Sequence, residues 1–84
     1  MHNDRGIRYF QEGDYDDALL QFIQARTADA TAGEIHFNLA LVRIQLGEED
    51  KVPEHLQLAK RYADDNPRIL NSPLLKKYLA GNPG

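Results

Sequence analysis

The sequence contains no cysteine, and its apolar residues form no long uninterrupted run. Without cysteine the chain has no disulfide framework, no thiolate nucleophile and no sulfur ligand for a metal. No apolar stretch approaches the roughly 18 residues that a membrane-spanning helix needs, and the first five residues lack the basic and then apolar pattern of a signal peptide. We therefore expect a soluble chain, in the cytoplasm rather than secreted, unless a targeting segment has been removed.

Motifs that would carry chemistry are also missing. The three histidines lack the spacing of a metal site such as His-Glu-x-x-His, and no glycine is followed by the Lys-Ser or Lys-Thr of a phosphate-binding loop. The carboxylates between Asp14 and Asp17 lack the spaced ligands and the terminal glutamate of a calcium loop. The sequence therefore predicts no enzyme, no cofactor and no metal site.

The net charge of −3 is unevenly distributed. Residues 1–54 carry five Lys or Arg against 11 Asp or Glu, whereas residues 55–84 carry five against two. A nucleic-acid interface needs a concentrated basic face, so we expect no nucleic-acid partner. The asymmetry allows attraction between the two ends of different copies, but exposed ion pairs are weak and screened by salt.

The sequence repeats itself at an offset of 34 residues, the period of a solenoid built from helix pairs. Each helix pair in such a fold buries its apolar face against a neighbouring copy. At 84 residues a single compact core would bury only about 60% of the unfolded surface, so stacking between the copies has to supply stability. The matched residues are Gly6, Phe10, Gln11, Gly13, Phe22 and Ala25 in the first copy, and Ala40, Ile44, Gln45, Gly47, Leu56 and Ala59 in the second.

The segment from Tyr9 to Leu19, continued by Phe22 and Ala25, closely resembles the tetratricopeptide repeat. A second, looser copy begins with residues 36–40 and continues through Gly47, Leu56 and Ala59, with Arg43, Val52 and Pro53 as departures in place of Tyr9, Ala18 and Leu19. The resemblance implies an all-α fold, a right-handed α-solenoid of antiparallel helix pairs with about five helices. We expect one domain over residues 1–84, with repeats at about 3–31 and 32–66, a capping helix at about 67–81 and a disordered tail at 82–84. The resemblance implies that the C-terminal segment covers the exposed face of the last repeat, with Leu70, Leu74, Leu75, Tyr78 and Leu79.

Glycine, proline and short polar residues predict where the helices begin and end. We expect helices at about 4–12, 14–28, 31–46 and 50–63, a short turn near 67–71 and a final helix near 73–80. Gly13 is expected to end the first helix in the left-handed conformation. The predicted N-terminal caps are Asp14, a capping box from Thr31 to Glu34, Asp50 ahead of Pro53, Asn66 and Ser72.

The resemblance implies a concave groove lined by the first helix of each pair. The spacing of Phe37, Leu41 and Ile44 independently predicts one apolar helix face, which Ile7 and Phe10 repeat 34 residues earlier. Such a strip either receives a peptide or helix of a partner protein, or is filled by this chain's final helix or the final helix of a second copy. The expected partner-binding residues are Asn3, Ile7, Phe10, Gln11, Phe37, Asn38, Leu41, Ile44 and Gln45.

We therefore predict a protein-binding module of unknown partner. There are two alternatives. The chain is a module that self-assembles, for example into a homodimer, or it is an accessory domain of a larger protein. Some family members hold a terminal carboxylate with a clamp of Lys, Asn and Arg, but here only Asn38 and Arg68 correspond, and we reject that ligand. The resemblance places His36 at a core position, whereas His55 is expected at the surface.

Overall fold

A computed structural model describes residues 2–80, and within that range the chain is all-helical, as predicted. The first antiparallel pair consists of α1 (His2–Gln11) and α2 (Tyr15–Ala28). The second consists of α3 (Gly33–Gln45) and α4 (Val52–Arg61), joined through a 3₁₀ turn, η1 (Glu49–Lys51). Two short helices, α5 (Pro67–Leu70) and α6 (Pro73–Leu75), follow, and α6 continues into a turn of π-helix, η2 (Lys76–Ala80).

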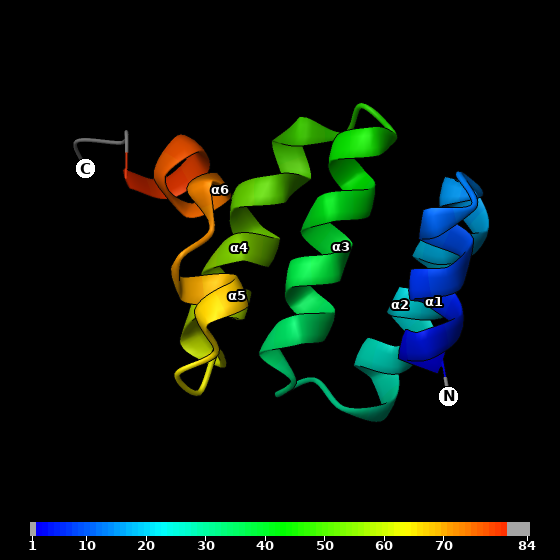
Figure 1. Cartoon of the computed structure of the whole chain (residues 1–84), viewed down its shortest axis with the longest axis horizontal. Coiled ribbons are helices and arrows are strands. Elements are labelled where there is room, and N and C mark those ends of the chain that lie inside the picture. Colours follow the sequence, from blue (N-terminus) through cyan, green and yellow to red (C-terminus); the bar gives the residue numbers. More distant parts are fainter. Residues whose placement is uncertain (1, 81–84) are drawn as a thin grey trace.

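The helix pairs lie side by side, with α3 and α4 in the middle of the molecule (Figure 1). The pair α1–α2 lies at one end of the longest axis and the segment α5–α6 at the other. No helix within residues 2–80 combines the length and the apolar character needed to cross a membrane.

Helix α3 belongs to both hydrophobic cores, and eight of its 13 residues are buried. Leu39 and Val42 pack with Phe22 of α2 in the first core. Phe37 and Ala40 belong to the second core, which includes Leu56 of α4 and Ile69 of α5. A helix buried on two sides shows little amphipathic contrast, and this explains why its apolar residues occupy more than one face.

The two turns within the helix pairs repeat the same hydrogen bonds at the 34-residue offset. The N–H of Asp14 donates to the carbonyl of Tyr9 at 2.9 Å, and the N–H of Glu48 donates to the carbonyl of Arg43 at the same distance. Gly13 and Gly47 adopt φ values of 83° and 76°, which confirms the left-handed turn predicted for Gly13. This conformation is open to glycine and strained for most other residues.

The connection before α4 is longer than the one before α2, as Pro53 predicts. Residues 46–51 separate α3 from α4, whereas residues 12–14 separate α1 from α2. Pro53 lies in the first turn of α4, where its missing N–H costs no helical hydrogen bond. The capping residue is Lys51 and not Asp50, because η1 occupies the intervening turn.

Besides Asp50, two further predicted caps, Asp14 and the capping box, are wrong. Asp14 precedes α2 but its side chain makes no capping hydrogen bond. The capping box is absent because α3 begins at Gly33 with Ala32 as its N-cap. The hydroxyl of Thr31 instead donates to Asp29 at 2.8 Å, in the loop before the helix.

The C-terminal segment confirms the other caps. The side chains of Asn66 and Ser72 accept hydrogen bonds from the N–H groups of Arg68 and Leu74, at 3.0 and 3.2 Å. Four apolar residues of this segment pack against the second core and cover it, as predicted: Leu74, Leu75, Tyr78 and Leu79. Leu70 stays 43% exposed, so its predicted covering role is wrong. The tail predicted for residues 82–84 lies outside the described residues.

Both histidines of the second pair are buried. Nε2 of His36 donates a hydrogen bond to the carbonyl oxygen of Ala30 at 2.7 Å, and the ring stacks on Tyr62, which confirms its structural role. His55 is only 6% exposed, so its predicted surface position is wrong. Burial, together with the nearby positive charges of Arg43 and Arg26, lowers the pKa of His55 to about 4.

The close approach of α1 and α2 generates a first prediction. Gly6 is buried, and a Cβ at this position would collide with the ring of Phe22. Gly6→Ala should therefore lower the free energy of unfolding by about 1 to 3 kcal/mol, although alanine favours helix. Urea unfolding monitored by circular dichroism measures the change. Arg5→Ala, on the exposed neighbour, should change stability by less than about 0.5 kcal/mol.

The buried His55 generates a second prediction, in the acidic range. Its pKa is depressed in the folded state, so the unfolded chain binds more protons between pH 6.5 and about 4. The contribution of His55 to stability is complete above pH 6.5 and is lost as the pH falls toward 4, by about 2 to 3 kcal/mol at pH 4.5.

Urea unfolding of the wild type and of His55→Gln at several pH values isolates the contribution of His55 to the pH dependence of stability. Glutamine is the matched substitution because Gln21 stands at the equivalent position of the first pair. The difference in unfolding free energy between the two chains should change with pH over this window. A constant difference would show that His55 is protonated without cost in the folded state.

Candidate functional site

The predicted partner-binding residues come from α1 and α3, the first helix of each pair. Five of the nine line one pocket of about 250 Å³ between these helices. Phe22 of α2 and Arg68 of α5 complete its wall. The five are Ile7, Phe10 and Gln11 from α1, and Asn38 and Leu41 from α3.

The other four predicted residues do not line this pocket. Phe37 is only 5% exposed and belongs to the second core, and Ile44 packs against the same core. Gln45 is exposed at the C-terminal end of α3. Asn3 lies one turn before Ile7 on α1 and contacts the pocket through Asn38.

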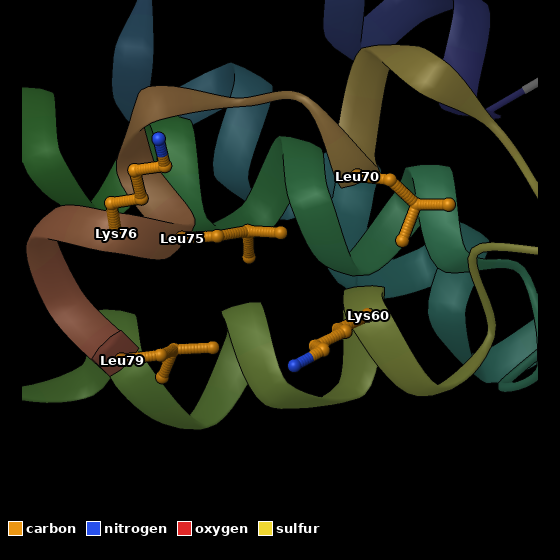
Figure 2. A pocket seen from close by; sticks show the side chains of 5 residues that line it. All are labelled: Lys60, Leu70, Leu75, Lys76 and Leu79. Carbon is orange, nitrogen blue, oxygen red and sulfur yellow. The ribbon is translucent and has the colours of Figure 1, made fainter.

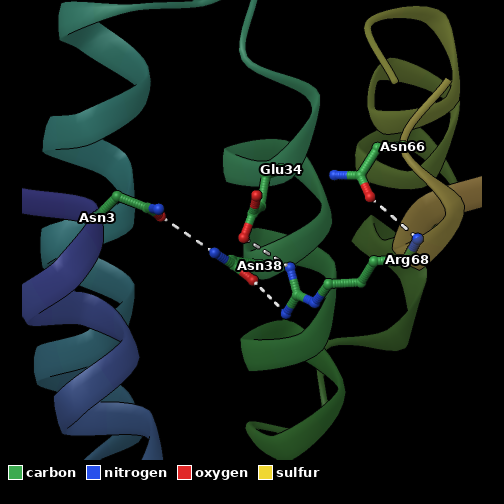
Figure 3. A network of polar contacts seen from close by, with 5 residues as sticks. All are labelled: Asn3, Glu34, Asn38, Asn66 and Arg68. Atoms are coloured by element: carbon green, nitrogen blue, oxygen red, sulfur yellow. Dashed lines mark hydrogen bonds and ion pairs between the residues drawn. The ribbon is translucent and has the colours of Figure 1, made fainter. Parts of the chain in front are cut away.

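A chain of polar contacts joins three segments across this face (Figure 3). Asn38, which is 2% exposed, donates from Nδ2 to Oδ1 of Asn3 at 3.0 Å. Nη2 of Arg68 donates to Oδ1 of Asn38 at 3.0 Å. Nη1 of the same guanidinium donates to Glu34 at 3.1 Å. The buried amide of Asn38 therefore has partners on both sides, which a polar group removed from water requires.

Arg68 also covers the aromatic ring of Phe37, with its guanidinium carbon 5.0 Å from the ring centroid. This cation–π contact holds the arginine over the face of α3. Its charge is balanced by Glu34, so the rim of the pocket carries one cation paired with one anion.

The sequence indicates Arg68 only through the rejected carboxylate clamp. It does not indicate that Phe22 lines the pocket. The repeat pattern pairs Phe22 with Leu56. The ring of Phe22 reaches the pocket because Gly6 on α1 leaves room for it. Arg68 lies 30 residues from Asn38, so their contact follows from the docking of α5 and from no local pattern.

A model of the tetratricopeptide repeat family matches residues 9–71, three quarters of the chain. The chain belongs to the tetratricopeptide repeat family. Tetratricopeptide repeats generally mediate protein–protein interaction and form a non-catalytic type of module. Neither a curated protein nor a solved structure matches the chain.

The pocket between α1 and α3 of this tetratricopeptide protein is lined by apolar side chains and by a few groups that can form hydrogen bonds. No cluster of three His, Cys, Asp or Glu side chains that could hold a metal ion occurs within residues 2–80. The polar groups at the pocket are side-chain amides and the guanidinium of Arg68. These groups can form hydrogen bonds with a ligand.

The network around Asn38 generates a third prediction. Arg68→Met keeps an unbranched apolar stem but removes the guanidinium and leaves Oδ1 of Asn38 buried without its donor, so stability should fall by about 1 to 3 kcal/mol. Glu34→Gln removes only a half-exposed ion pair, and its cost should stay below about 1 kcal/mol. Urea unfolding compares the two. Equal losses would mean that the ion pair, and not the bond to Asn38, carries the stabilisation.

Proposed function

We propose that the chain binds an extended or helical segment of a partner protein along the face formed by α1 and α3. The observation that carries this proposal is the convergence of residues from both repeats on one pocket, as described above. The family relationship supports a protein partner and leaves its identity open.

The pocket suits one apolar side chain of the partner. Its apolar lining comes from Ile7, Phe10 and Leu41, which are partly buried and therefore retain accessible surface, and from Phe22. Covering this surface supplies the favourable free energy, at about 25 cal/mol for each Å² removed from water. A groove lined in this way is typical of helix or peptide recognition.

Amide side chains next to the pocket supply hydrogen bonds for the backbone of the partner. Gln11 is exposed at the pocket, and Gln45 is exposed one repeat further along. Asn3 uses its oxygen for Asn38, so its amide nitrogen remains available to a ligand. Asn38 lines the pocket. Phe37 lies in the second core beneath the guanidinium of Arg68, and Ile44 packs against the same core.

The position of the final helix favours this interpretation over filling of the strip by the chain itself. Leu74, Leu75, Tyr78 and Leu79 pack against the second core, as do Leu41 and Ile44. The pocket between α1 and α3 is lined by no residue of α6 or η2. Its Ile7 and Phe10 side therefore stays open to a ligand.

The fourth prediction concerns binding by this groove. Peptides selected from a phage-displayed library against the wild type should bind Leu41→Lys at least about tenfold more weakly, because the substitution places an ammonium in the apolar pocket. Ile7→Lys, on the opposite wall, should weaken the same peptides. Isothermal titration calorimetry measures the affinities after circular dichroism has confirmed the helical fold.

Leu20→Lys is the matched control, because Leu20 is 53% exposed on α2 and outside the pocket. It should leave the affinity for these peptides unchanged. Peptides that bind both groove variants as tightly as the wild type would contradict the proposal.

A further inference from the structure

Two large apolar side chains stand out on the surface of residues 2–80. Leu20 on α2 is 53% exposed and Leu70 on α5 is 43% exposed. Neither lines the groove between α1 and α3. A single exposed leucine needs no explanation, but each of these two has charged neighbours of one sign.

The neighbours of Leu20 are acidic. Asp16 and Asp17 precede it by four and three residues on α2, and these spacings place them beside it on the helix surface. Both aspartates are exposed, and neither forms an ion pair with any other described residue. This acidic patch, defined by Asp16, Asp17 and Leu20, belongs to the negatively charged part of the chain.

The neighbours of Leu70 are basic. Leu70, Leu75 and Leu79 line a pocket of about 290 Å³ together with Lys60 and Lys76. Figure 2 shows Leu75 and Leu79 in the space between α4 and the α6–η2 segment, with Lys60 on α4, while the side chain of Lys76 is directed away from α4. Both lysines are exposed and form no ion pair within the described part of the chain. The pocket is slightly smaller than the range of about 300 to 1,000 Å³ typical of small-molecule sites, and its size suits an inserted side chain.

We propose that the acidic patch of one copy of the chain docks into this basic pocket of a second copy. Leu20 of one copy enters between the three leucines of the other, and its two aspartates face Lys60 and Lys76. The observation behind this choice of partner is that the chain itself carries both halves of the contact, with opposite charges left unpaired in each.

Such a contact joins two different surfaces, so each copy keeps one free patch and one free pocket. An interface of this heterologous type extends into a chain of copies when its rotation does not close a ring. One leucine and four charges cover far less than the roughly 800 Å² per partner of a stable interface. The association is therefore weak, reversible and sensitive to salt, and it uses none of the groove residues.

Sedimentation equilibrium of the full chain tests this proposal as the fifth prediction. The weight-average mass should rise above that of the monomer as the concentration approaches about 1 mM at low salt. Raising the salt to about 0.5 M should weaken the association about tenfold, because the ion pairs are exposed.

Two neutralised variants provide the decisive comparison. Asp16→Asn with Asp17→Asn removes the acidic charges, and Lys60→Gln with Lys76→Gln removes the basic ones. Each variant alone should be monomeric, while an equimolar mixture should form a one-to-one dimer and nothing larger, because only one intact contact remains. Glu49→Gln with Asp50→Asn, which makes the same charge change on η1, should associate like the wild type.

Several outcomes would contradict the proposed association. A wild type that stays monomeric at about 1 mM in low salt would overturn the proposal. So would variants that associate like the wild type, or a mixture that stays monomeric. Association that is lost in Leu41→Lys and retained in Leu20→Lys would assign it to the groove instead. Failure of peptide binding in the groove leaves this test unaffected, since the two surfaces share no residue.

Discussion

The structure depends on the burial of α3 on two sides. A pair of helices of this size cannot bury its apolar face alone, so the two pairs have to share a helix surface. Leu39 and Val42 of α3 pack in the first core, while Phe37 and Ala40 pack in the second. The pocket between α1 and α3 depends on this shared element, because α3 forms one of its walls.

The polar contacts complete what apolar packing begins. Packing alone permits small sliding motions between helices, whereas Asn38 fixes α3 to Asn3 of α1 and to Arg68 of α5. Because the amide of Asn38 is buried, losing either partner costs more than an exposed hydrogen bond would. The same contacts that define the groove therefore hold the two repeats and the C-terminal segment in register, which keeps the proposed binding surface preorganised.

The repeat offset predicted most of the fold, because it records a regular physical pattern. Glycines at 13 and 47, Pro53, and the caps Asn66 and Ser72 act locally, so the sequence located the helix ends within a few residues. The burial of His55 and the contact of Arg68 with Asn38 depend on how distant helices dock. No local pattern reports such contacts, and the partner-binding roles of the groove residues remain predictions for the same reason.

Native-state amide hydrogen exchange tests the central claim, that sharing α3 makes the two pairs one cooperative unit. If α3 is held by both cores, the slowest amides of α2, α3 and α4 should exchange with the same opening free energy and the same dependence on urea. Opening of α1 and α2 at a distinctly lower free energy, with α3 and α4 still protected, would contradict it. The repeats would then be separate units, and the groove between them would lack a fixed geometry.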